Sequence, residues 1–161
     1  MEQCIKKLAR KFTFYANQSK DFAYLYDVYA KLCRVLSIKY GLGVRLRAAY
    51  QANDKTALKG LISELKKAEK RLGEFYEAFH ELWYKENKPN GFEVQDMRLG
   101  GLLQRWKNCR RRLQNYVDGK ELALPELEDV LLDFWGNGLE YGKQTPCHND
   151  WGGMMTVNQL N

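Results

Sequence analysis

Apolar residues recur at alternating steps of three and four between Asp54 and Asn87. This spacing places them on one helical face, so the segment predicts a long helix packed along its length. Asp54 is a suitable N-cap, because its carboxylate can accept hydrogen bonds from the free N–H groups of the first turn. Pro89 and Gly91 predict the end of the helix. The apolar positions are Leu58, Leu61, Leu65, Ala68, Leu72, Phe75, Phe79 and Leu82.

A comparable pattern predicts a second helix from about Asp21 to Ala52. Gly41 and Gly43 weaken it locally, by about 1 kcal/mol each relative to alanine. They mark either a kink or a place where another helix comes very close. The two helices are separated by only two or three residues, so they should form an antiparallel hairpin. The expected apolar face is Leu25, Val28, Leu32, Val35, Leu42, Leu46 and Ala49, widened by Phe22, Tyr29, Leu36 and Tyr50.

A third helix is predicted from about Val94 to Val117, ended by a turn at Asp118-Gly119. Pro125 then suits the first position of a short helix that continues to Phe134, with acidic residues in its first turn. The expected apolar face of the third helix is Val94, Met97, Gly101, Leu102, Trp106, Cys109, Leu113 and Tyr116.

The two ends of the chain have different patterns. Residues 1–17 form an amphipathic stretch that predicts a short helix or a linker. Residues 136–161 are rich in glycine and predict an irregular tail, whose apolar residues, Trp151 among them, should pack on a surface. The sequence therefore predicts one all-α domain over residues 1–161, with its core from about 20 to 135. Three long antiparallel helices form the bundle, with short flanking helices and the tail beside it.

Composition supports a folded helical domain. Of the 161 residues, 45% are hydrophobic, 13% are aromatic and three are proline. The net charge of +6 is modest for this size. No apolar run approaches the roughly 20 residues that span a bilayer, and the charged N-terminus lacks the apolar stretch of a secretory signal. We therefore expect a cytoplasmic protein.

The cysteines and histidines predict neither a metal site nor a cofactor. Cys4, Cys33, Cys109 and Cys147 are far apart and have no CxxC spacing, so we expect reduced, mostly packed thiols. The two histidines, His80 and His148, have no cysteine at the spacing of a zinc finger. His80, beside Phe79 on a helix edge, is expected to be structural.

No motif of a complete active site occurs. Gly41-Leu-Gly-Val-Arg45 lacks the later glycine and the preceding strand of a phosphate-binding loop, and no Gly-x-Ser-x-Gly elbow is present. Carboxylates such as Glu64 and Glu69 alternate with lysines, which is typical of a solvated helix face with weak i,i+4 pairs. We therefore predict no catalytic residue in this chain.

A basic run offers the strongest candidate for nucleic-acid contact. Trp106, Cys109 and Leu113 interrupt it at helical spacing and should face inward, which leaves a solvated charged face as the favoured interpretation. No aromatic stacking platform accompanies the run, so we expect no nucleic-acid partner. The four tryptophans, Trp83, Trp106, Trp135 and Trp151, are assigned to core or interface packing rather than to sugar stacking. The basic run is Arg105, Lys107, Arg110, Arg111 and Arg112.

The stretch from Trp83 to Leu102 is unusual for a plain helical bundle. Adjacent glycines cost a helix stability, so Gly100 and Gly101 predict a close backbone approach. This approach is either a tight helix crossing or a surface shaped for another domain. The expected interface residues are Trp83, Glu86, Asn87, Glu93, Gln95, Asp96, Arg98, Gly100, Gly101 and Trp151.

The same stretch, with its Glu-Val-Gln-Asp-x-Arg-x-Gly-Gly-Leu motif at 93–102, resembles the helical C-terminal domain in a branch of glycoside hydrolase family 20 β-N-acetylhexosaminidases. Three further elements resemble that domain in the same order: residues 42–50, the Leu113, Tyr116 and Gly119 turn, and His148-Asn149-Asp150-Trp151. The resemblance extends from about residue 20 to the end of the chain.

In that family, the resemblance implies a (β/α)₈ barrel before this domain. The barrel removes terminal N-acetylhexosamine from glycans and uses an adjacent Asp-Glu pair. This chain has no Asp-Glu dipeptide and is shorter than the roughly 250 residues of such a barrel. It is therefore expected to be a non-catalytic domain whose partners are the barrel and, in a homodimer, a second copy. The alternatives are a free-standing helical interaction module and a basic helical protein that binds nucleic acid.

Overall fold

A computed structural model describes residues 1–128, which contain helices and no strand. The all-α class predicted from the sequence is therefore confirmed. The chain divides into two compact units, Met1–Ala123 and a second that begins at Leu124, and each is described by itself. The helices are α1 (Glu2–Gln18), α2 (Ala23–Lys39), α3 (Leu42–Gln51), α4 (Lys55–Glu86) and α5 (Phe92–Val117) in the first unit, and α6 (Pro125–Glu128) in the second.

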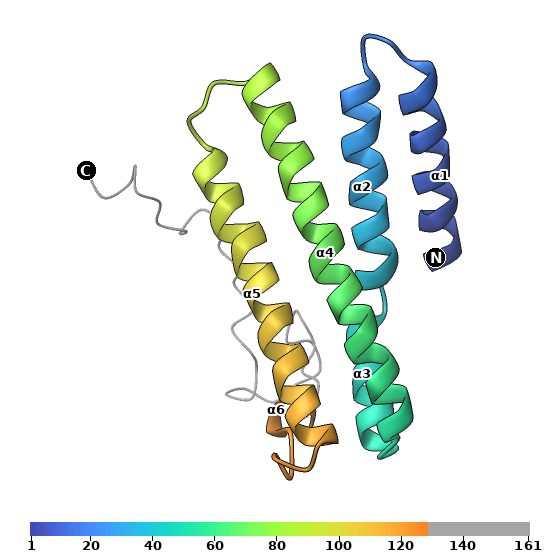
Figure 1. Cartoon of the computed structure of the whole chain (residues 1–161), viewed down its shortest axis with the longest axis vertical. Coiled ribbons are helices and arrows are strands. Elements are labelled where there is room, and N and C mark those ends of the chain that lie inside the picture. Colours follow the sequence, from blue (N-terminus) through green and yellow to red (C-terminus); the bar gives the residue numbers. More distant parts are fainter. Residues whose placement is uncertain (129–161) are drawn as a thin grey trace, which may run out of the picture. The chain divides into compact units, whose positions relative to one another are not determined.

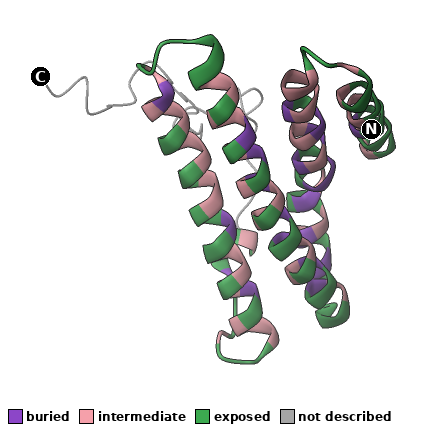
Figure 2. Cartoon of the chain, turned by 45° about the horizontal axis from the view of Figure 1, so that its top comes forward, coloured by how far each residue is buried: buried purple, intermediate pink, exposed green. Residues whose placement is uncertain are grey.

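In the first unit, α1, α2, α4 and α5 lie side by side in one layer, each antiparallel to the next (Figure 1). The main contacts join α1 to α2, α2 to α4 and α4 to α5, while α3 packs on α4. Buried residues are most numerous on α2 and α4, and α1 and α5 at the ends of the layer are mostly exposed or half-buried (Figure 2). The core is therefore a series of seams between neighbouring helices.

The long helix α4 confirms the clearest sequence prediction. The Asp54 carboxylate accepts a hydrogen bond from the backbone N–H of Ala57 at 2.9 Å, as expected of an N-cap. The helix ends at Glu86, before Pro89 and Gly91. Its buried face comprises Leu58, Leu61, Leu65, Ala68, Leu72, Phe75 and Ala78, whereas Phe79 and Leu82 are half-buried.

We expect Asp54→Ala to lower the free energy of unfolding by about 1 kcal/mol, because an N–H group of the first turn loses its acceptor. Asp54→Asn is the matched control, since the amide oxygen can still accept the bond from Ala57. Urea unfolding of both variants measures the difference. Equal losses in the two variants would show that the cap contributes nothing through this bond.

The single helix predicted from Asp21 to Ala52 is wrong, because the segment divides into α2 and α3. Gly41 lies at φ 73°, a left-handed conformation that glycine adopts without steric cost, and it caps α3. The alternative of a close helix approach is also wrong, since a Cβ at Gly41 or Gly43 would meet nothing within 4 Å. The glycines mark a break between two helices.

Part of the predicted apolar face of this segment points to solvent. Val28, Val35, Leu42, Leu46 and Ala49 are buried as predicted, and Leu25, Leu32 and Tyr50 are half-buried. In contrast, Phe22, Tyr29 and Leu36 are 57%, 44% and 38% exposed. A single layer explains the difference, because α2 has α1 and α4 on its two edges only, and the Phe12 ring of α1 covers Tyr29 only in part.

Helix α5 begins two residues before the predicted start and ends at Val117 as predicted, followed by the Asp118–Gly119 turn. The prediction that Met97 and Gly101 face inward is wrong: both are exposed, because α5 contacts α4 along one seam only. In the second unit, α6 begins at Pro125 as predicted. Residues 129–134 of that predicted helix, and the tail at 136–161, lie outside the described residues. None of the helices described up to residue 128 is sufficiently long and apolar to cross a membrane.

Candidate functional site

The turn between α4 and α5 is built around Phe92, the first residue of α5. Its side chain is only 1% exposed. Five rings from the last three turns of α4 surround it, with centroid separations of 5.0–5.9 Å. Such edge and tilted ring contacts add to the stability gained by burial. The rings belong to Tyr76, Phe79, His80, Trp83 and Tyr84.

A left-handed glycine and two hydrogen bonds between side chains and the backbone fix the shape of this turn. Gly91 caps α5 at φ 99°, which favours glycine, and a Cβ there would lie 3.4 Å from the Trp83 ring. The backbone N–H of Gly91 donates to the Glu93 carboxylate at 2.7 Å, and the Trp83 indole N–H donates to the carbonyl oxygen of Lys88 at 3.0 Å. Trp83 and Glu93 therefore stabilise the turn itself.

One turn further along α5, a groove of about 340 Å³ lies between α4 and α5. It contains one glycine from each helix, Gly73 and Gly100, and a Cβ at either position would meet nothing within 4 Å. The groove is thus an apolar hollow with few polar groups, a shape suited to receiving a side chain or ligand. Its lining is Leu72, Gly73, Tyr76, Glu77, Asp96, Leu99, Gly100 and Leu103.

A hydrogen bond across one end of the groove joins Tyr76 to Asp96. The Tyr76 hydroxyl donates to the Asp96 carboxylate at 2.7 Å. This bond, followed by partial burial and the charge of Asp96, raises the pKa of Tyr76 from 10.0 to about 12. The bond orients both side chains at the rim of the groove.

We expect Tyr76 to ionise about two pH units above an ordinary tyrosine, and Asp96→Asn to return its pKa towards 10. The raised pKa favours the folded state below about pH 10, and this contribution disappears as the pH rises to about 12. Ultraviolet titration measures the step as the difference between the chain and Tyr76→Phe. A step near pH 10 in that difference spectrum would contradict the hydrogen bond.

The predicted interface residues divide into separate groups. Trp83, Asn87 and Glu93 belong to the turn, while Asp96 and Gly100 line the groove. Glu86 accepts a hydrogen bond from the Tyr24 hydroxyl, beside the contact between Lys85 and the Tyr24 ring, and so ties α4 to α2. The remaining residues are Gln95 and Arg98, which are half-buried, Gly101, which is exposed, and Trp151, which lies outside the described residues.

The interpretation of Gly100 and Gly101 as a tight crossing within this domain is wrong. Both are exposed, and no side chain or other helix approaches within 4 Å of a Cβ built on either. Gly100 lines the open groove between α4 and α5, where the two helices leave a hollow instead of a close contact. The other interpretation, a surface for another domain, is left open by this geometry.

Sequence reasoning missed three residues of this region: Gly73, Tyr76 and Phe92. Gly73 carries a usable signal, because a glycine in the middle of a long, strongly patterned helix costs about 1 kcal/mol and suggests a packing reason. Phe92 follows Gly91 directly and lies two residues before the predicted start of the third helix at Val94. Tyr76 has no local signal, since its role depends on Asp96 on the other helix.

Several glutamates pair with arginines that are distant in the sequence. Glu69 accepts two hydrogen bonds from Arg110, at 2.7 and 3.2 Å, and Glu64 likewise pairs with Arg45 at 2.7 and 2.9 Å. The predicted solvated face with i,i+4 pairs is therefore wrong for these two glutamates, which connect neighbouring helices. Arg112 pairs with Glu121 at 3.2 Å, while Arg105 and Lys107 are exposed.

The described cysteines, His80 and Trp106 differ in their burial and neighbours. Cys33 is buried and Cys109 half-buried, as expected of mostly packed thiols, whereas Cys4 is exposed and Cys147 lies outside the described residues. His80 lies 4.4 Å from the Tyr84 ring and 5.0 Å from the Phe92 ring, between centroids. Trp106 is buried, as predicted. Within residues 1–128, no group of three or more His, Cys, Asp or Glu residues is placed to hold a metal ion.

Residues 1–145 match the family model described as the Glycoside Hydrolase 20C C-terminal domain. The match covers both the turn and the groove, and includes α1, which lies before the region of resemblance recognised in the sequence. No curated protein matches the chain significantly.

Proposed function

Since the chain belongs to the glycoside hydrolase 20C C-terminal domain family, we propose that it is the non-catalytic helical domain of a β-N-acetylhexosaminidase. The parent enzyme would remove terminal N-acetylhexosamine from glycans, with the chemistry performed by a catalytic barrel. The role of the present chain is to pack against that barrel.

The observation that carries this proposal is the open groove between α4 and α5. Helix interiors normally avoid glycine, which costs about 1 kcal/mol relative to alanine. Gly73 and Gly100 nevertheless line one groove of about 340 Å³, with nothing of the described chain within 4 Å of a Cβ at either. A partner that enters the groove would explain why glycine occupies both positions, because without a side chain there the partner can approach the two helix backbones closely.

The pairing of several described carboxylates favours a structural role. Glu64, Glu69 and Glu121 each pair with an arginine, and Asp96 accepts a bond from Tyr76. Hydrolysis of a glycoside needs two carboxyl groups that face one another across the scissile bond, or a carboxyl group and the substrate acetamide. We therefore expect the purified chain not to hydrolyse a chromogenic N-acetylglucosaminide.

A second copy of the chain is a further candidate partner, favoured by the exposed apolar side chains on α1 and α2. Leu8 and Tyr15 share one face of α1 by their spacing of seven residues, and Tyr29 and Leu36 share one face of α2 in the same way, with exposed Tyr40 just after its end. Phe12 connects the two stripes, since its ring lies 5.4 Å from that of Tyr29. Light scattering of the purified chain tests for a dimer, and Tyr29→Lys with Leu36→Lys should return a dimer to a monomer.

The proposed function is tested by the coding region and by reconstitution. A family 20 barrel encoded with this chain is expected, and the separately produced barrel should bind the chain and gain stability or activity. Absence of any barrel-encoding sequence would favour the free-standing interaction module. Hydrolysis of the chromogenic substrate by the chain alone would overturn its non-catalytic role.

A further inference from the structure

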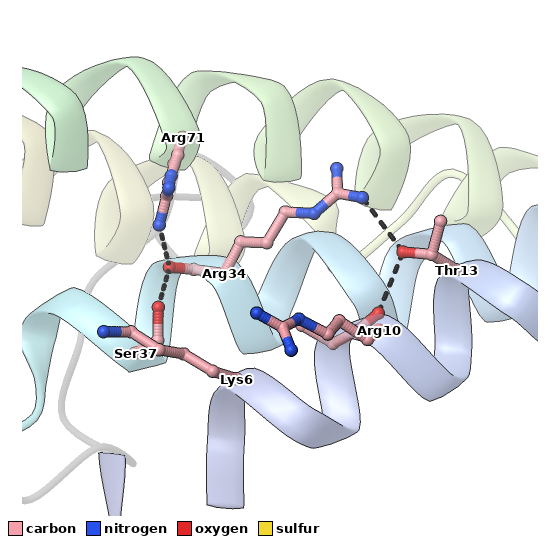
Figure 3. Close-up of a pocket in the computed structure, with 7 residues that line it drawn as sticks. Lys6, Arg10, Thr13, Arg34, Ser37 and Arg71 are labelled. Carbon is pink, nitrogen blue, oxygen red and sulfur yellow. Dashed lines mark hydrogen bonds between the residues drawn. The ribbon is translucent and has the colours of Figure 1, made fainter. Parts of the chain in front are cut away.

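A second hollow, formed by α1, α2 and α4, is strongly basic. It measures about 420 Å³ and its lining includes four cations and two hydroxyl groups (Figure 3). No carboxylate is among the residues that line it. α1 and α4 supply the two walls and α2 the floor between them. The lining is Lys6, Ala9, Arg10, Thr13, Arg34, Ser37 and Arg71.

The inner arginines are held in place by hydrogen bonds to neutral groups. Arg34 donates from Nη2 to the Thr13 hydroxyl at 3.0 Å, and Arg71 donates from Nη1 to the carbonyl oxygen of Arg34 at 3.1 Å. The buried Ser37 hydroxyl donates to the same carbonyl at 2.9 Å. A guanidinium group has five N–H donors, so most donors of Arg34 and Arg71 stay available for a ligand.

These arginines differ from the other interhelical arginines of the chain. Arg45 and Arg110 each form a two-point pair with a glutamate. Within residues 1–128, Arg10, Arg34 and Arg71 form no ion pair with a carboxylate, and Lys6 pairs only with Glu2, at 2.5 Å on the exposed rim. Like charges that converge without a counter-charge repel one another, and a bound anion removes that cost.

We propose that this pocket binds a tetrahedral oxyanion, phosphate or sulfate, either free or as the ester of a small sugar. Guanidinium groups suit such anions, because their planar forks donate paired, charge-assisted hydrogen bonds to two oxygens at once. Three of them approach from three different helices, an arrangement that matches an anion with oxygens in several directions better than a single planar carboxylate. The volume of about 420 Å³ also lies within the range of small-molecule sites, about 300–1,000 Å³. This site is independent of barrel docking.

Calorimetric titration of the whole chain at low salt tests the proposal with four probes. The probes are inorganic phosphate, inorganic sulfate, N-acetylglucosamine 6-phosphate and uncharged N-acetylglucosamine. The three anions should bind at one site, more weakly as sodium chloride increases, and the uncharged sugar should not bind. A sugar phosphate that binds at least tenfold more tightly than inorganic phosphate identifies an ester site, and equal affinities identify a site for the anion alone.

Two variants locate the site. Arg10→Gln removes an exposed side chain and should leave the fold intact, while Arg34→Gln removes a fixed donor, and each should weaken anion binding about tenfold or more. Arg105→Gln on α5 is the matched control, because it makes the same charge change outside the pocket and should leave binding unchanged. Circular dichroism checks the fold of each variant. If Arg34→Gln does not fold, the affinity of Arg10→Gln tests the proposal by itself.

Three results would overturn the proposal. The first is the absence of anion binding at low salt. The second is an equal loss of affinity in Arg10→Gln and Arg105→Gln, which would show a general charge effect. The third is binding of an acidic peptide without binding of phosphate or sulfate, which would assign the pocket to a protein partner.

Discussion

Replacing Phe92 with alanine should lower the free energy of unfolding by about 3–5 kcal/mol, the usual cost of removing a buried aromatic side chain. The effect should lie at the upper end of this range because Phe92 is 1% exposed and five rings of α4 surround it. Those rings cannot all collapse into the space, since Trp83 is also held by its bond to the Lys88 carbonyl. Urea unfolding of the variant measures the loss.

Met97→Ala is the matched control for this prediction. Met97 lies on the same helix and is 45% exposed, so its truncation should change the stability by no more than about 0.5 kcal/mol. A small loss for Phe92→Ala, comparable with that of Met97→Ala, would show that the aromatic cluster does not hold the α4–α5 turn. A large loss for both variants would place Met97 in a buried environment instead.

The sequence predicted well those features that depend on one helix. The apolar stripe from Leu58 to Phe75 is local, and so is the Asp54 cap, because both follow from spacing along a single segment. The break at Gly41 was misjudged because a glycine between two helical patterns is compatible with a kink, a close approach or a stop. The observed φ of 73° identifies the stop, and the open space around Gly41 and Gly43 excludes the close approach.

The contacts between helices were harder to predict. Periodicity shows which face of a helix is apolar, but it does not show which other element covers that face. Tyr29 and Leu36 fit the apolar pattern of α2, and yet both side chains are exposed. The groove depends on Tyr76 and Gly73 of α4 meeting Asp96 and Gly100 of α5, and the paired residues Tyr76 and Asp96 are 20 positions apart. The basic pocket depends on three helices, so no single segment signalled it.

One layer of helices has a physical consequence that connects these surfaces. In a compact bundle each helix packs against at least two others around a shared core, whereas the helices at the ends of this layer, α1 and α5, each make their main contacts with one neighbour. The stability of those end helices then depends on narrow seams, such as that between Phe92 and α4. A partner bound to a broad face of the layer would bury exposed apolar side chains. This burial would stabilise the end helices, whose narrow seams contribute little stability by themselves.

The second large effect should appear at Gly100, where the free chain and the docked chain respond in opposite directions. In the free chain Gly100→Leu should raise the stability by up to about 1 kcal/mol, because leucine is a better helix former and a Cβ there meets nothing within 4 Å. In a complex with the barrel the leucine side chain would occupy the groove. Overpacking of this kind costs about 1–3 kcal/mol, which corresponds to affinity lower by roughly 5- to 150-fold.

Gly60→Leu provides the control, because Gly60 is an exposed glycine of α4 outside the groove, again with nothing within 4 Å of a Cβ. Both variants should therefore gain helix stability, and only Gly100→Leu should lose affinity for the barrel. Thermal unfolding of the free chain and surface plasmon resonance with the immobilised barrel measure the two quantities. Unchanged affinity in Gly100→Leu would remove the groove from the docking surface, because a leucine cannot share that space with a closely packed partner.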